Sequence, residues 1–277
     1  MSFANLYENP GPRGVRRNRV LTVAVGAVLL AVAAFVIVRF EEKDQWAAAK
    51  WTPLLRGDVW ATFILPGLVG TLSAAVAGVV LAGLFGLVFA AARLSEHRWI
   101  RVPAAVVVEF FRSVPLLLLI FFAFFGSYVL IGTNISAFAA VVFGLTLYNG
   151  SVIAEILRAG VLSLPKGQRE AAYAVGMRKN QVMRLVLLPQ ALKAMLPALV
   201  SQFIVLLKDS ALGLIVGYDE LVDRGLNGIA ANFSNVIPAA ILIAAIFIVI
   251  NLALDRLAHR LAASGTIRTA RKPAPVA

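Results

Sequence analysis

The sequence predicts an all-α integral membrane protein with about six transmembrane helices. Its 277 residues are 60% hydrophobic and only 14% charged, too few charges to cover a soluble domain of this size. The apolar residues gather in long uncharged blocks at 20–38, 59–92, 113–154 and 225–254. A helix needs about 20 apolar residues to cross the hydrocarbon core of a bilayer. The blocks lack strict alternation of polar and apolar residues, which argues against a β-barrel.

Breaks within these blocks divide them into six expected spans, near 20–38, 67–92, 103–125, 137–157, 195–217 and 237–255. Pro66 and Gly67 are expected to interrupt the second block, leaving 52–65 as an interfacial stretch. The turn that divides the third block is expected at Gly126, Gly132, Thr133 and Asn134. The predicted transmembrane domain covers 19–258, between tails at 1–18 and 259–277.

The basic residues predict the orientation. Of the 26 Lys and Arg residues, 19 fall in segments that share one side of the membrane: 1–19, 93–101, 158–193 and 256–277. Because Lys and Arg are enriched on cytoplasmic segments, both termini are expected in the cytoplasm. Spread over four segments, these charges do not indicate a nucleic-acid site. Residues 1–40 could be a signal peptide, but the apolar stretch is long and lacks a small-x-small cleavage site, which favours an uncleaved span.

Few residues could carry out chemistry. The chain has no cysteine, and His97 and His259 both lie in basic polar segments, so we expect no metal site. A phosphate-binding G-x-x-x-x-G-K-[ST] loop and an H-E-x-x-H motif are both absent. We therefore expect no catalytic residue and no cofactor bound by this chain.

The most informative motif lies in the long cytoplasmic loop, residues 158–194. Glu170-Ala171-Ala172 is followed after three residues by Gly176, and after nine more by Val186-x-Leu188-Pro189. Residues 166–175 contain good helix formers, and Gly176 can adopt a positive φ that ends a helix. A second short helix then leads to Pro189. Two short helices at an angle would form a stiff projection that can dock on a soluble partner. The alternative is an ordinary amphipathic helix pair at the membrane surface.

This spacing resembles the EAA loop of bacterial ABC importer permeases, with Val186 where isoleucine is commonest. Further stretches resemble the polar amino acid family of these permeases: 109–115, 154–160, 164–168, 188–191 and 206–210. Residues 138–157 are similar to actinobacterial glutamate transporter permeases. The resemblance covers roughly residues 60–258. It implies the type I ABC importer permease fold and import of a polar amino acid, with glutamate as the first expectation and arginine, glutamine or histidine as alternatives.

The resemblance also implies partners. These are a second permease subunit, two ATPase subunits that bind ATP and Mg²⁺, and an external amino-acid-binding protein, all at a bacterial cell membrane. A heterodimer of permeases is expected, with a homodimer left open. The binding protein is expected to dock on outer loops that include Asp219, Glu220 and Asp223. The ATPase coupling residues would be Glu170, Ala171, Ala172, Gly176, Leu188 and Pro189. An ion-coupled secondary transporter, a channel and a membrane scaffold are the rival classes.

Polar residues within the expected spans are candidates for the substrate path, because a charge at the centre of a span needs a partner or a wet cavity. Asp209 could bind an α-ammonium group, as the matching residue does in the family, or could form an ion pair with another span. Its neighbour Lys208 is expected to be structural. Asn149 and Ser151 could bind substrate, or Asn149 could form an interhelical hydrogen bond that the small Gly150 allows.

Two pairs of opposite charge lie three residues apart near the cytoplasmic ends of spans. Glu109 is a candidate path residue, but it could instead pair with Arg112 on the same helix face. Glu155 and Arg158 have the same spacing and are expected to anchor the coupling loop.

Overall fold

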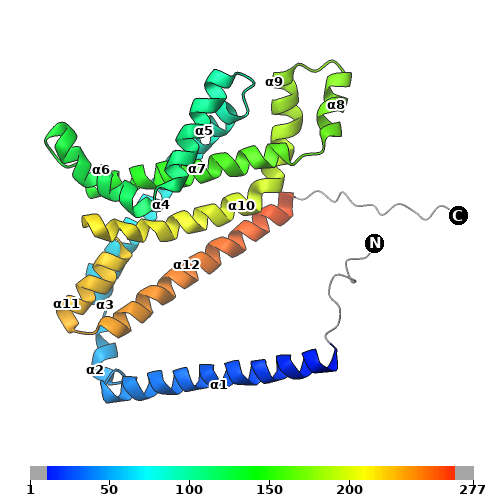
Figure 1. Cartoon of the computed structure of the whole chain (residues 1–277). Coiled ribbons are helices and arrows are strands. Elements are labelled where there is room, and N and C mark those ends of the chain that lie inside the picture. The colour runs from blue at the N-terminus through cyan, green and yellow to red at the C-terminus, as the bar shows by residue number, and fades with distance from the viewer. Residues whose placement is uncertain (1–10, 266–277) are drawn as a thin grey trace. The chain divides into compact units, whose positions relative to one another are not determined.

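The computed structural model describes residues 11–265, and every regular element in that range is a helix. The described residues form two compact units, 11–53 and 54–265, which are treated separately (Figure 1). The predicted tails fall partly outside this range, at residues 1–10 and 266–277.

The first unit is dominated by one long helix, α1 (Pro12–Glu42). Pro12 suits the first helical position because its missing N–H has no intrahelical acceptor there. None of the side chains in α1 is buried, and large apolar side chains such as Val23, Leu30 and Phe35 are exposed around it. A helix that is apolar on all sides is typical of a span that faces lipid. It contains the span predicted at 20–38, and a short helix, α2 (Ala48–Trp51), follows.

The second unit contains the remaining helices. The α-helices are α3 (Gly57–Val59), α4 (Leu65–Arg93), α5 (Arg98–Ser113), α6 (Leu116–Ile131), α7 (Ala137–Leu162), α8 (Lys166–Ala174), α9 (Lys179–Gln181), α10 (Leu188–Asp209), α11 (Ile229–Phe233) and α12 (Val236–Gly265). The π-helices are η3 (Trp60–Ile64), η4 (Val182–Leu187) and η6 (Leu221–Gly228). The 3-10 helices are η2 (Thr52–Leu55), which crosses the boundary between the units, and η5 (Ser210–Val216).

The count of spans agrees with the prediction. Over residues 11–265, five helices are long and apolar enough to cross a membrane, and the bent pair α5–α6 brings the number to six. Helix α7 contains the span predicted at 137–157, and α12 contains the one at 237–255. The predicted fifth span, 195–217, belongs to a longer helical run that begins at Lys179 and ends at Val216.

The expected break at Pro66 and Gly67 is wrong. The chain is helical from Gly57 to Arg93, so 52–65 is not a separate interfacial stretch. A proline lacks an N–H group and its ring crowds the carbonyl four residues earlier. The π-helix η3 ends two residues before Pro66, and η4 ends two residues before Pro189. A wider helical turn accommodates the proline without ending the helix.

The span expected near 103–125 is divided into two helices. Helices α5 and α6 meet at a bend of 97°, and between them Val114 has an extended backbone (φ −83°, ψ 128°). The following residue, Pro115, disfavours the helical conformation in its predecessor, which explains why the helix stops there. The turn predicted within this block is present at Gly132, which has the left-handed conformation at the end of α6, but Gly126 lies inside α6 and is not part of it.

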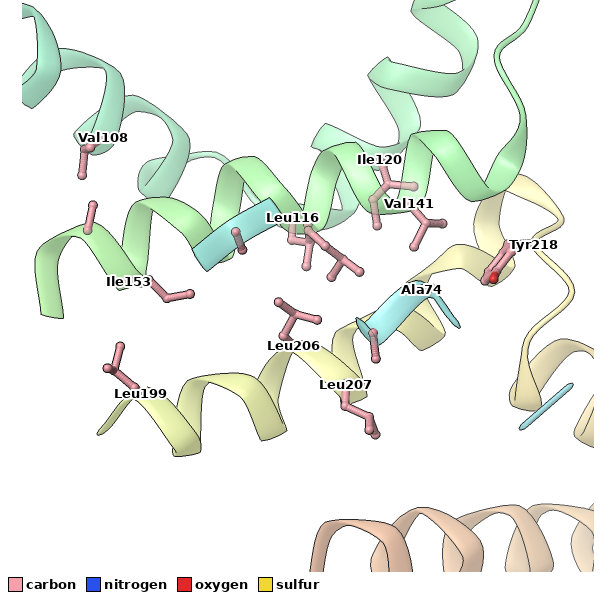
Figure 2. Close-up of a cluster of buried hydrophobic side chains, with 14 of the residues drawn as sticks. Ala74, Val108, Leu116, Ile120, Val141, Ile153, Leu199, Leu206, Leu207 and Tyr218 are labelled. Atoms are coloured by element: carbon pink, nitrogen blue, oxygen red, sulfur yellow. The ribbon is translucent and has the colours of Figure 1, made fainter. Parts of the chain in front are cut away.

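The core of the second unit lies between α4, α6, α7 and α10. Figure 2 shows side chains from these helices converging, among them Ala74, Ile120, Ile153 and Leu206. Helices α7 and α10 run side by side, with α12 along the other side of α10 (Figure 1). Because the bilayer removes the usual gain from burying apolar surface, helices in a membrane depend on close van der Waals packing.

Glycines make this close packing possible where α4 crosses α7. A Cβ atom added to Gly86 would lie 2.5 Å from Cγ2 of Ile153 and 3.2 Å from the carbonyl oxygen of Gly150. Gly150 in turn leaves no room for a Cβ beside Phe85. The two backbones therefore approach more closely than any larger residue would allow.

We predict that Gly86→Ala destabilises the protein by about 1–3 kcal/mol, because the added methyl group overpacks the α4–α7 contact. Gly83→Ala is the matched control, since no atom lies within 4 Å of its added Cβ. That change should be neutral or stabilising by up to about 1 kcal/mol, through helix propensity. Thermal unfolding in detergent measures both. Equal melting temperatures for the two variants would contradict the packing account.

Candidate coupling segment and transport path

The coupling segment, defined here as residues 166–189, begins with α8, and Gly176 ends that helix as predicted. Gly176 has φ +80°. Its N–H donates to the carbonyl of Tyr173 at 2.9 Å, and the N–H of Met177 donates to the carbonyl of Ala172 at 3.2 Å. These two bonds form a Schellman motif, which satisfies the last carbonyls of a helix and requires a left-handed residue. The turn between α8 and α9 is thus closed by backbone hydrogen bonds.

The motif residues of α8 lie on two faces. Ala172 is buried against Val161, Val182, Leu187 and Ala191, so it fixes α8 to the rest of the unit. The other motif residues are open to the surroundings: Glu170, Ala171, Gly176 and Pro189 are exposed, and Leu188 is partly exposed.

The outer face of α8 also carries uncovered apolar side chains. Tyr173 is 45% exposed and Val175 is 76% exposed. In Figure 1, α8 and α9 stand side by side beyond the ends of α7 and α10. The coupling segment therefore presents an exposed apolar surface next to Glu170, while its opposite face is packed through Ala172.

Polar contacts attach the coupling segment at two further points. The amide Nε2 of Gln190 donates to the side-chain oxygen of Gln168 at 3.3 Å, which joins α10 to α8. Lys179, at the start of α9, forms an ion pair with Glu96 in the loop between α4 and α5. The hydrogen bond from Lys179 holds the pKa of Glu96 below its ordinary value. Both links cross between elements that are distant in sequence.

A network of ion pairs lies where α4, α5 and α7 end near this segment. Arg93 Nη1 is 3.1 Å from Glu109 Oε1 and 3.0 Å from Glu155 Oε2, and its side chain is only 10% exposed. Glu155 also binds Arg158, and Glu109 lies 3.4 Å from Arg112, so both expected pairs form. Glu109, a candidate for the substrate path, is thus bound in ion pairs at the helix ends. The bridging role of Arg93 was not predicted, because nothing in the sequence indicates which helices meet there.

The candidate path residues Asn149 and Ser151 are both fully buried on α7. Oδ1 of Asn149 accepts a hydrogen bond of 2.6 Å from Nε2 of Gln202 on α10, so the expected interhelical bond exists. The carboxylate of Asp209 interacts with the Asn149 side chain, although Asn149 Nδ2 finds no partner of hydrogen-bond geometry among the described residues. Ser151 Oγ is likewise without one there. A buried Asn149 amide thus lies beside a carboxylate, and a second buried donor, Ser151 Oγ, lies two residues farther along α7.

Two further polar residues, Gln202 and Lys208, lie on α10. Gln202 was missed by sequence reasoning, although its spacing of seven residues from Asp209 places the two on one helix face and could have indicated it. Lys208 is exposed while Asp209 is partly buried, as expected for neighbours that point about 100° apart on a helix.

The connection between α10 and α12 corrects one expectation. Glu220 is fully buried, so it cannot serve as a docking residue for an external protein in this conformation. Its carboxylate accepts backbone hydrogen bonds from Val222 (2.9 Å) and Asp223 (2.8 Å) at the start of η6. Close packing on α4 explains the burial, because Gly67 and Gly70 leave no space for a side chain against residues 219–221. Asp219 remains exposed, 2.7 Å from Arg224.

Comparison with known proteins identifies the family. The sequence profile of "Binding-protein-dependent transport system inner membrane component" matches residues 82–264, which include the coupling segment and the buried polar residues. The chain belongs to this family. The family assignment makes it a multi-pass membrane protein and a transport permease rather than an enzyme.

Individual relatives refine the assignment. The chain is 51% identical over 219 residues to the glutamate transport system permease protein GluD of Corynebacterium glutamicum, covering 78% of this chain and 80% of that protein. It is 35% identical to the arginine transport system permease protein ArtQ of Bacillus subtilis, covering 65% and 82%. The crystal structure of an amino acid ABC transporter with histidines matches with a TM-score of 0.67 at 35% identity, covering 72% of this chain and 92% of that one. The fold is therefore that of type I ABC importer permeases.

We predict a pH-dependent stability that originates at Glu220, which lies outside the spanning helices. Burial raises the pKa of Glu220 from 4.5 to about 7. The folded protein then keeps a proton that the unfolded chain releases, so stability falls as the pH rises from about 4.5 to 7. The slope can reach about 1.4 kcal/mol per pH unit. Glu220→Gln should remove this part of the dependence, as measured by melting temperature between pH 5 and 8. Parallel pH profiles for the two proteins would refute the assignment.

Proposed function

We propose that this ABC permease subunit imports a polar amino acid, with glutamate as the first candidate, by alternating access driven by a separate ATPase. The observation that carries the proposal is the coupling segment: a braced projection whose outer face is open, in a chain 51% identical to a glutamate transport permease. Glutamine, arginine and histidine are the alternatives. A probable glutamine permease of Bacillus subtilis is 36% identical to this chain, and an arginine permease is 35% identical.

The partner ATPase is assigned to the outer face of the coupling segment. Tyr173 and Val175 supply exposed apolar area, and Glu170 supplies a charge beside them. The sequence has no phosphate-binding loop, so ATP and Mg²⁺ would bind the ATPase subunits and this chain would bind no cofactor. Hydrolysis would then move the projection as a rigid body because its inner face is packed.

The transport path is assigned to the buried polar residues of α7 and α10. Asp209 can bind the α-ammonium group of an amino acid. The Asn149 amide beside it and the buried Ser151 hydroxyl can donate to the carboxylate of that amino acid. Glu109 is already held by Arg93 and Arg112, so we place it outside the path as a stabiliser of the helix ends.

The proposed assembly contains this chain, a second permease subunit, two ATPase subunits and an external amino-acid-binding protein, in a bacterial cell membrane. A heterodimer of permeases is preferred. The excess of Lys and Arg on four segments supports a cytoplasmic location for both termini and for the coupling segment. On the external side of the membrane, the exposed Asp219 and the partly exposed Asp223 remain available to contact the binding protein.

Reconstituted uptake tests the function directly. Proteoliposomes containing this chain, its partner subunits and the binding protein should accumulate labelled glutamate only when ATP is supplied to the ATPase subunits. Labelled arginine and glutamine serve as competing substrates. Uptake without an ATPase, driven by an ion gradient, would instead support a secondary transporter.

Variants of the coupling segment test how ATP drives transport. Gly176→Leu and Glu170→Lys should abolish ATP-dependent uptake and leave membrane insertion intact, because the first distorts the end of α8 and the second reverses a charge on its outer face. Gly132→Leu is the matched control: Gly132 has φ +77°, Gly176 has φ +80°, and neither has an atom within 4 Å of an added Cβ. Gly132 lies at the end of α6, outside the coupling segment. Normal uptake by both coupling variants, or equal loss in the control, would contradict the proposal.

A further inference from the structure

A basic pocket of about 320 Å³ lies between the coupling segment and the ends of α4 and α7. It is distinct from the polar cluster around Asn149, and it shares Tyr173 with the outer face of α8. Its charged lining residues are five cations and one carboxylate: Arg93, Arg101, Arg158, Arg169, Lys179 and Glu96.

The cations of this basic pocket are only partly neutralised. Arg93 and Arg158 pair with carboxylates of the ion-pair network, and Lys179 pairs with Glu96. Arg169 and Arg101 enter no ion pair with any residue that the structure describes. The side chain of Arg101 donates a hydrogen bond of 3.4 Å to the backbone carbonyl of Ser95. Glu109 and Glu155 of the ion-pair network and Glu96 in the pocket make three carboxylates, against the five cations that line the pocket. The pocket therefore retains positive charge and free guanidinium donors.

An apolar pocket of about 470 Å³ adjoins the basic pocket. The two share the apolar residues Leu94, just after α4, Val161 on α7 and Met183 on η4, and also the ion pair of Glu96 and Lys179. The apolar pocket continues along the face of α4, where Leu87 is 48% exposed and Ala91 is also exposed. This face belongs to a membrane-spanning helix, so the apolar pocket opens toward lipid.

We propose that the two pockets together bind an anionic phospholipid, with its phosphate in the basic pocket and part of an acyl chain in the apolar pocket. Arginine suits this role because its planar donors bind phosphate oxygens in pairs. The basic pocket lies where the spans α4 and α7 end, which is the depth of lipid headgroups. Basic pockets between helix ends attract anionic headgroups. A free phosphate compound would satisfy the same arginines but leave the apolar pocket unfilled.

A lipid held there would touch the coupling segment and the body of the permease at once. Arg169 belongs to α8, Lys179 to α9, and Leu87 to α4. Occupancy would thus brace the projection against the spans, without contact with the transported amino acid.

The test measures lipid retention by the full-length chain co-expressed with its partner subunits and purified in detergent. After exposure to phosphatidylglycerol or phosphatidylcholine vesicles, bound lipid is counted by native mass spectrometry. The double variant Arg101→Gln, Arg169→Gln should lose phosphatidylglycerol about tenfold or more, because it removes two charged contacts. The matched control, Arg98→Gln with Arg184→Gln, removes the same charge from exposed positions that line neither pocket and should retain the lipid.

A second variant tests the apolar pocket and the source of the phosphate. Ala91→Phe fills that pocket with all charges kept, and should weaken phosphatidylglycerol retention. Val88→Phe, at an exposed position outside the pocket, should not. Glycerol 3-phosphate and inorganic phosphate are tested as competitors. Equal retention of phosphatidylcholine, equal loss in both arginine variants, or displacement by glycerol 3-phosphate at lipid-like affinity would each overturn the lipid assignment.

Discussion

Helix continuity between the coupling segment and the buried polar cluster is the constraint on which the rest of the structure depends. A single helical run from Lys179 to Val216 carries the attachment of the coupling segment at one end and Gln202 and Asp209 farther along. Pro189 would ordinarily interrupt such a run, and the π-helix η4 accommodates it. Because a helix is stiff along its axis, a displacement of the coupling segment would reach the polar cluster without an intermediate loop.

The same run explains why the body of the permease has to be tightly packed. The helical run from Lys179 to Val216 can transmit a movement only if the helices packed against it do not deform. Helix α7 is held rigid by its close contact with α4 at Gly86 and Gly150. Ala172 and the pair between Lys179 and Glu96 hold the projection to that body. Stiffness, and not any reactive group, is therefore the property that suits this chain to its role in an ABC transporter.

Sequence patterns that act within one helix were predicted well. Gly176 was expected to end a helix with positive φ, and the pairs Glu109–Arg112 and Glu155–Arg158 were expected from their spacing; all three are present. The long apolar blocks likewise predicted the spans that became α7 and α12. Prolines were harder to interpret, since Pro115 bends the chain by 97° whereas Pro66 sits inside a continuous helix. Pro103 and Pro197 also lie inside continuous helices, α5 and α10, and composition alone does not reveal which proline ends a helix.

Features that depend on contacts between distant helices could not be predicted. Arg93 bridges two carboxylates on α5 and α7, and Gln202 meets Asn149 across 53 residues. Glu220 was expected to be an exposed acidic residue in a loop. It is buried because the glycines on α4 leave room for its backbone to pack against that helix. A single sequence contains no information on these pairings beyond the presence of small residues at the contact.

The absence of cysteine from the chain allows a direct test of the central claim that the coupling segment contacts a separate ATPase. A single cysteine at Val175, labelled with a photoreactive maleimide, should cross-link to the ATPase subunit, with a yield that changes when ATP is added. A cysteine at Leu130, which is 84% exposed near the end of α6, is the control and should not cross-link to it. A Val175 probe that reacts only with lipid or with the external binding protein would contradict the account.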